Sequence, residues 1–236
     1  MKRLMAVVVG VVMGSLVAAR SAVAQVGYEP EKSPYRDVGY RQGVTAFAGW
    51  FSAALDPARV ASRSGPMAGL RYDLTLAGPA QLTVRSAYVH SERNVIDPRQ
   101  PRATQMLGRR SAPLLLNDVG ISLNLTGARS WHNLIPLIQF GGGTATDLNA
   151  GADIGNYSFG TTFALSLGTG LRWVSGGRWE VRGDVTDHLY SIRYPSTYAK
   201  SFTTNPNDAV LGTSDSRSRW RHNAGLTIGL TYKFLR

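Results

Sequence analysis

The sequence contains no cysteine. This absence excludes a disulfide framework, a thiolate zinc site, an iron–sulfur cluster and a cysteine nucleophile. The sequence also has only four histidines, which leave little room for a histidine-rich metal site, and it has no Walker A motif. We therefore expect no metal and no cofactor.

Charge is scarce as well. Charged residues make up 17% of the 236 residues, whereas about 25% is usual in a soluble domain. The apolar and aromatic content is nevertheless too high for a disordered chain. After the N-terminal segment there is no run of 18 apolar residues, so no transmembrane helix is expected.

The N-terminal segment has the features of a secretory signal peptide. Lys2 and Arg3 precede an uncharged run over residues 4–19, and a small-x-small cleavage site, Ala22-Val23-Ala24, follows it. The alternative is an N-terminal membrane anchor, but the run is shorter than the roughly 20 residues that a spanning helix needs. We predict a cleaved signal peptide over 1–24 and a polar periplasmic extension over 25–43.

The rest of the chain alternates apolar and polar residues, the period of a β-strand. Leu70 and Tyr72 share one face of a predicted strand, for example, and Arg71 and Asp73 share the other. Two of the eight predicted strands are less regular, because 44–51 is apolar on both faces and 134–144 contains Pro136 and three glycines. The predicted strands span 44–51, 68–76, 82–91, 117–125, 134–144, 159–173, 178–190 and 222–234.

The connections between these strands alternate in length. Short connections at 77–81, 126–133 and 174–177 alternate with long ones at 52–67, 92–114, 145–158 and 191–221. Transmembrane barrels have short periplasmic turns, long outer loops and an even number of strands. The sequence therefore predicts an all-β fold, an eight-stranded antiparallel up-and-down transmembrane β-barrel over 44–236. A soluble β-sheet with one buried face is the alternative, because it alternates too.

Aromatic residues gather where the predicted strands end, and all five tryptophans lie at strand ends or turns. Aromatic rings with a polar atom favour the membrane interface, so we predict two aromatic girdles. The girdle residues are Trp50, Trp173, Trp179, Trp220, Tyr88, Tyr190, Tyr232 and Phe234.

The leader, the strand count, the loop rhythm and the closing strand 224–234 resemble the small eight-stranded outer-membrane β-barrels, a group that includes the OmpA transmembrane domain, OmpX, OmpW and the opacity-protein-like barrels. The resemblance implies export to the outer membrane of a Gram-negative-type cell. It also implies recognition by the barrel-assembly machinery, because these families end in an alternating strand with an aromatic last residue. This chain departs from that pattern, since Leu235 and Arg236 follow Phe234.

The inward face of the predicted barrel carries charges of both signs. An eight-stranded barrel is just wide enough for side chains to fill it, and charges removed from water there must pair. We expect a plugged polar core; small inward residues such as Gly168 and Gly170 leave a narrow ion or solute path as the alternative. The predicted network comprises Arg71, Asp73, Arg85, Asp118, Arg172, Glu180, Arg182, Asp184 and Lys233, with His188 on the same face.

The outer loops carry most of the positive charge. Removing the leader lowers the net charge from +11 to +8, and the four long loops hold +5 of it. Guanidinium groups pair well with phosphate, so outer-membrane lipids and lipopolysaccharide are the expected partners, although a merely solvated basic surface explains the charge equally well. An exported protein does not meet nucleic acid in the cytoplasm, so none is expected. The candidate contacts are Arg109, Arg110, Arg217, Arg219 and Arg221.

We predict a non-enzymatic outer-membrane protein with a structural or surface-interaction role. The first alternative is a small pore or a lateral conduit for small or hydrophobic solutes, as in the OmpW-like group. The second is a lipid A-modifying enzyme, which would need a nucleophile and a base on one strand face. His90 and Ser91 are adjacent, and His188 and Ser191 are three apart, so both pairs lie on opposite faces. A cross-strand pair stays open, and the oligomeric state is not indicated.

Overall fold

The computed structural model describes residues 33–149 and 151–235. The predicted signal peptide and residues 25–32 of the predicted extension lie outside the described residues. The fold described below lies in one compact unit, which begins at Tyr35. Within the described ranges no helix is long and apolar enough to cross a membrane.

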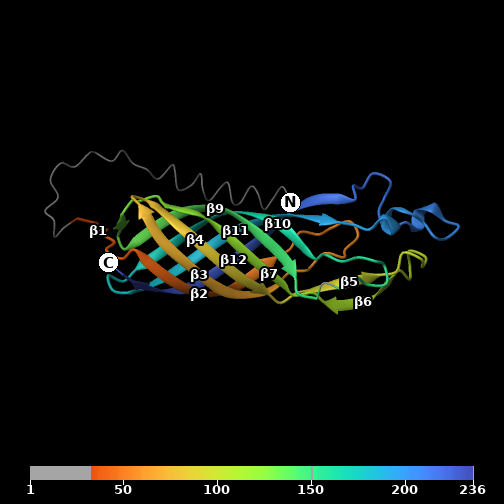
Figure 1. Ribbon diagram of the computed structural model, residues 1–236, viewed down its shortest axis with the longest axis horizontal. Coiled ribbons are helices and arrows are strands. Elements are labelled where there is room, and N and C mark those ends of the chain that lie inside the picture. Colours follow the sequence, from red (N-terminus) through yellow and green to blue (C-terminus); the bar gives the residue numbers. More distant parts are fainter. Residues whose placement is uncertain (1–32, 150, 236) are drawn as a thin grey trace. The chain divides into compact units, whose positions relative to one another are not determined.

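Eight long strands form a closed antiparallel ring (Figure 1). Consecutive members of the ring pair with each other, and the last strand pairs back with the first, from Ala224↔Ser52 to Phe234↔Gln42. The predicted eight-stranded antiparallel barrel is therefore confirmed, and its closure leaves no free strand edge in the ring. The ring comprises β2 (Gln42–Ser52), β3 (Gly65–Ala77), β4 (Ala80–Val89), β7 (Leu114–Asn124), β9 (Leu134–Asp147), β10 (Thr161–Val174), β11 (Trp179–Arg193) and β12 (Ser218–Phe234).

The connections contain short elements that the sequence patterns do not predict. At the end with the short turns, β1 (Tyr35–Asp37) pairs with β8 (Arg129–Trp131). At the other end, β5 (Glu92–Ile96) and β6 (Met106–Ser111) form a hairpin in the loop between β4 and β7. Figure 1 shows β1 and the β5–β6 hairpin at opposite ends of the barrel. Two 3₁₀ turns, η2 (Ser196–Ala199) and η3 (Pro206–Asp208), lie in the loop between β11 and β12.

The two faces of the barrel wall differ in polarity. Leu167, Leu226 and Ile228 point outward and are 66%, 62% and 65% exposed. Arg71 and Arg172 point inward and are buried. Large apolar side chains exposed in a continuous belt are unfavourable in water and favourable in lipid. The arrangement is the inverse of a soluble β-sheet, and it identifies a transmembrane barrel.

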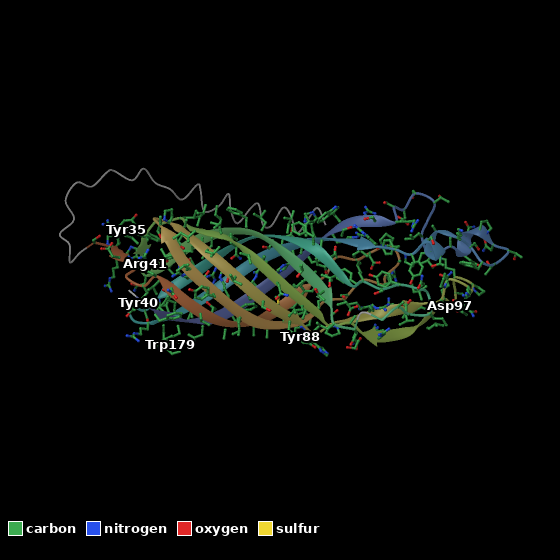
Figure 2. All side chains as sticks on the ribbon, viewed as in Figure 1. Tyr35, Tyr40, Arg41, Tyr88, Asp97 and Trp179 are labelled. Carbon is green, nitrogen blue, oxygen red and sulfur yellow. The ribbon has the colours of Figure 1, made fainter. Side chains whose placement is uncertain are left out.

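The aromatic side chains lie mostly on the outward face. Trp50, Trp173, Trp179 and Trp220 are each about half exposed, Tyr88 and Tyr232 are exposed, and Phe234 is half-buried. Figure 2 shows Trp179 on the outside of the barrel at the same end as β1, and Tyr88 on the outside nearer the loop end.

The prediction that places Tyr190 in the outer girdle is wrong. Its side chain is buried, and its ring contacts Phe159 edge-on with centroids 5.5 Å apart. Tyr190 stands two residues after His188, so the strand period puts both on the inward face. Its place near a strand end suggested a girdle, but the period decides the direction of the side chain.

Candidate functional site

The centre of the lumen holds four coupled charges from two strands. Arg71 on β3 donates from Nε to both oxygens of Asp73, at 2.8 and 3.0 Å. Arg182 on β11 donates from Nε to Asp184 at 2.6 Å and from Nη1 across the lumen to Asp73 at 3.2 Å. A Cβ at Gly170 would lie 2.3 Å from Oδ1 of Asp184, so the glycine makes room for this carboxylate.

A second group closes the end with the short turns. Arg172 on β10 makes a forked pair with Glu180 on β11, with Nε–Oε2 and Nη2–Oε1 distances of 3.0 Å. Nζ of Lys233 lies 3.6 Å from the same carboxylate, and Arg172 also donates across the lumen to Asn124 at 3.3 Å. Two cations therefore share one buried carboxylate, and hydrogen bonds to neutral groups complete the pairing.

The third group is a pair on neighbouring strands. Arg85 on β4 donates from Nε to Asp118 on β7 at 2.9 Å and from Nη1 to the Thr186 hydroxyl at 2.9 Å. A cavity of about 10 Å³ adjoins this pair, which is enough for one water molecule. All nine residues of the predicted network are inward and buried, and each lies in an ion pair with another member.

The other half of the lumen is apolar, which the sequence reasoning did not predict. Phe51, Leu114, Leu116 and Ile192 are all buried on the inward face there. They join Met67, Val89 and Tyr190 in one cluster that continues into the loops through residues such as Val60, Ile96 and Leu211. The available signal was the apolar inner face of the first predicted strand, which carries Phe47 and Phe51. The lumen is thus filled by charge at one end and by hydrocarbon at the other.

The four long loops form one folded unit around a buried ion pair. Arg93 on β5 lies 2.5 Å from Asp153 in the loop between β9 and β10, and both side chains are buried. The guanidinium of Arg93 also lies over the ring of Tyr157, 5.1 Å from its centroid. Tyr157 in turn stacks on Tyr198, at 6.3 Å between centroids. These contacts join three loops and leave little freedom to any of them. We call the packed residues of the four loops the loop unit.

The first loop joins the loop unit through Asp56. The hydroxyl of Tyr194 donates to Asp56 at 3.0 Å, and the same carboxylate accepts the backbone N–H groups of Val60 and Ala61. Burial, followed by the negative charge of Asp56, raises the pKa of the Tyr157 and Tyr194 phenols above the usual tyrosine value; burial and the charge of Asp153 do the same for the pKa of Tyr198. All three phenols are therefore neutral at physiological pH.

The five arginines predicted to meet lipopolysaccharide fall into two groups. Arg109 and Arg110 lie on β6, Arg217 directly precedes β12, and Arg219 and Arg221 lie at its start. Arg110 donates to the carbonyls of Gly151 and Asn149, and Arg221 is half-buried with an unpartnered Nε. Among the described residues no hydrogen bond or ion pair joins the two groups. Arg109, Arg217 and Arg219 are the exposed members.

A cross-strand His–Asp pair lies on the outward face near the loop end. Nδ1 of His222 on β12 is 2.6 Å from Oδ2 of Asp187 on β11. In the described part of the chain no serine hydroxyl bonds His222; the nearby Ser191 hydroxyl bonds that of Ser218 instead, at 3.0 Å. The pair has the base and the carboxylate of a hydrolytic triad but no nucleophile in contact. His188 is buried in the lumen with an unpartnered Nε2.

Comparison with known proteins bears on the fold. No protein-family model and no curated protein sequence matches this chain. The outer membrane protein OprG from Pseudomonas aeruginosa superposes with a TM-score of 0.50 and 15% identity, over 84% of this chain and 98% of that one. Neisserial surface protein A superposes with a TM-score of 0.49 and 13% identity, over 82% and 97% of the two chains. The likeness to OprG confirms the resemblance to small eight-stranded outer-membrane barrels at the level of the fold.

Proposed function

We propose that this protein is a non-enzymatic anchor in the outer membrane of a Gram-negative-type cell and that it presents the loop unit at the cell surface. The main support is the continuous apolar cluster that fills the loop end of the lumen and extends into the loops. A barrel with such a core holds its loops rigidly and leaves no water-filled path through them. The lipid-facing belt and the aromatic residues at both of its ends support the location.

Fractionation and gel mobility test the location and the fold together. The full-length chain should appear in the outer-membrane fraction without its leader, and it should migrate differently when it is unheated and when it is boiled. Recovery of the chain in the soluble periplasm, with no mobility shift, would contradict the proposal.

Conductance in a planar bilayer separates an anchor from a pore. The purified protein should give no discrete steps, because ion pairs and apolar side chains fill the lumen. A porin purified in the same detergent is the positive control. Reproducible conductance steps from this protein would favour the pore alternative.

We further propose that the exposed arginines at the loop end of the barrel bind lipopolysaccharide phosphate. Arg109, Arg217 and Arg219 support this role, because their guanidinium groups are accessible and guanidinium matches phosphate geometry. Changing all three to glutamate should lower the lipopolysaccharide that copurifies with the protein several-fold. Arg129→Glu at the opposite end of the barrel is the matched control. Equal retention in both proteins would refute the lipid contact and leave the anchor role standing.

A further inference from the structure

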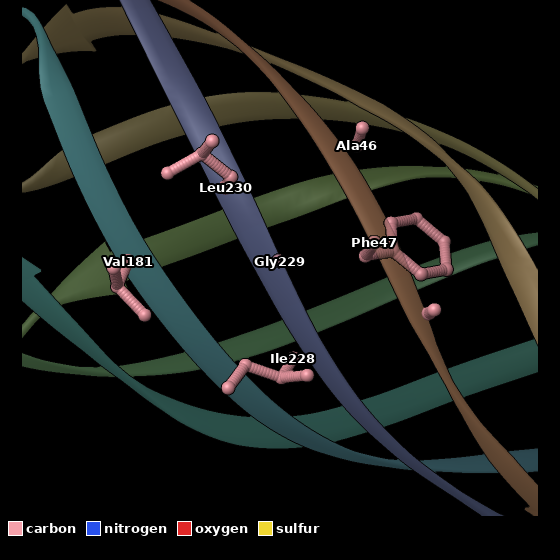
Figure 3. Close-up of a pocket in the computed structure, with 7 residues that line it drawn as sticks. Ala46, Phe47, Val181, Ile228, Gly229 and Leu230 are labelled. Carbon is pink, nitrogen blue, oxygen red and sulfur yellow. The ribbon is translucent and has the colours of Figure 1, made fainter.

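The lipid-facing surface has a groove over β11, β12 and β2 (Figure 3). It is shallow and open to the lipid, with a volume of about 470 Å³. It is lined by Val181 on β11, Ile228 and Leu230 on β12, and Ala46 and Ala48 on β2. On β2 the small outward residues Ala46 and Ala48 stand opposite the larger Leu230 and Ile228 of β12, and this step in side-chain size forms the groove.

One end of the groove reaches the rim with the short turns. Trp179 and Tyr232 are the next outward residues beyond Val181 and Leu230, and their rings lie 5.1 Å apart. Arg178 precedes β11 and donates from Nη1 to the hydroxyl of Tyr232 at 3.0 Å. A second tyrosine, Tyr40, also hydrogen-bonds the Arg178 side chain. Figure 2 shows Tyr40 and Trp179 at this same end of the barrel.

Arg178 is therefore a positioned cation at the mouth of an apolar groove. It is fully exposed, and two phenol groups restrain its guanidinium while leaving further N–H groups free to donate. The described segments at this rim carry Arg36, Arg41, Arg129 and Arg178 against a single acid, Asp37, and Asp37 is paired with Arg129. The rim thus complements a negative charge.

We propose that the groove and Arg178 together bind one anionic phospholipid of the leaflet that surrounds the short turns. One acyl chain lies in the groove between Val181 and Leu230 on one side and Ala46 and Ala48 on the other. The phosphate accepts hydrogen bonds from Arg178, and the rings of Trp179 and Tyr232 flank the glycerol region. This site is separate from the loop unit, so the inference goes beyond the proposed function.

The test is lipid retention measured by native mass spectrometry on the purified full-length protein. The protein in detergent is titrated with phosphatidylglycerol and, separately, with phosphatidylethanolamine of the same chains. We expect one phosphatidylglycerol to be retained several-fold more strongly than phosphatidylethanolamine. Arg178→Ala should remove this preference, and Ala48→Leu, which fills the groove, should weaken retention of both lipids.

Arg129→Ala is the matched control, because Arg129 lies at the same rim and belongs to an exposed ion pair away from the groove. It should retain phosphatidylglycerol like the parent. Unheated gel mobility verifies that each variant folds, and Ala46→Leu replaces Ala48→Leu if that variant does not. Equal retention of the two lipids by the parent, or unchanged preference in Arg178→Ala, would reduce the groove to ordinary annular contact and overturn the proposal. A dimer that Ala48→Leu disrupts would assign the groove to a second copy and overturn it too.

Discussion

The two halves of the lumen solve the same packing problem with opposite chemistry. Along the inward face of β11, the half near the short turns carries Glu180, Arg182 and Asp184, whereas the half near the loops carries Tyr190 and Ile192. The charged half depends on buried ion pairs within and between neighbouring strands and on one pair across the barrel, Arg182 to Asp73. The apolar half depends on close packing and continues into the loops.

The charged half of the lumen fixes the arrangement of the strands, and the apolar half supports the loops at the cell surface. A buried ion pair contributes little net stability but is costly to break, so the charged half specifies which strands face each other. The paired arginines also donate hydrogen bonds to amides on non-adjacent strands, Arg172 on β10 to Asn124 on β7 and Arg71 on β3 to Gln139 on β9. The apolar half instead transmits rigidity from the membrane to the loop unit.

The largest loss of stability is expected from a substitution in the charged half of the lumen. Asp118→Ala leaves Arg85 buried without its carboxylate and should lower the free energy of unfolding by about 3–5 kcal/mol. The measurement is the urea midpoint, followed by the gel mobility of unheated samples. The double variant Arg85→Met with Asp118→Leu should recover much of the loss, because no unpaired charge remains. A single variant as stable as the parent would mean that Arg85 is hydrated.

In the apolar half of the lumen, a large-to-small substitution destabilises the barrel by leaving a cavity and not by leaving an unpaired charge. Leu116→Ala should cost about 2–5 kcal/mol, because its buried side chain lies in a packed lumen that cannot collapse around the gap. The same urea titration measures the loss. Leu226→Ala on the lipid-facing side is the control, and its loss should be smaller because lipid chains refill the space. Equal losses of stability in the two variants would contradict dense packing in the half of the lumen near the loops.

The loop unit should respond to alkaline pH. The raised pKa values of Tyr157, Tyr194 and Tyr198 mean that the unfolded chain ionises first, so their contribution is complete below about pH 10 and falls as the pH rises further. Absorbance of the phenolate at 295 nm should show these tyrosines titrating after the exposed ones, and protease resistance of the loops should fall over the same range. Tyr157→Phe, which removes one hydroxyl without a partner, should lower the number of late-titrating tyrosines by one. Titration of all tyrosines together near pH 10 would contradict the burial of Tyr157, Tyr194 and Tyr198 in the loop unit.

The smallest effect is expected outside the lumen. Asp37→Ala breaks the exposed pair with Arg129 and should cost at most about 1 kcal/mol, since solvent screens such pairs. Raising the salt concentration should shrink even this difference in the urea midpoint. If Asp37→Ala lowered stability as much as Asp118→Ala, the exposed pair Asp37–Arg129 would matter as much as the buried pair Arg85–Asp118, contrary to this expectation.

The eight strands and their inward charges were predictable because both follow from a period of two. Arg71, Glu180 and Lys233 could be assigned to the lumen from alternation alone. The ties between non-adjacent strands were not predictable, because they depend on the register around a closed ring, which local spacing does not contain. The loop unit escaped prediction for the same reason: Arg93 and Asp153 meet across 60 residues, and neither lies in a periodic segment. The pair of Asp187 with His222 is likewise a cross-strand relation.

Strand β1 and the residues that follow it cross the opening of the barrel at the end with the short turns. It pairs with β8, between β7 and β9, whereas β2 begins on the far side of the ring, between β12 and β3. Val38 is held by Ala128 and Arg41 by Leu235, so the residues between them form a strap over the opening. The strap therefore has both of its attachments only when Ala128 and Leu235, from later parts of the chain, are in place. Because Leu235 directly follows β12, the strand that closes the ring, complete attachment of the strap marks a closed barrel.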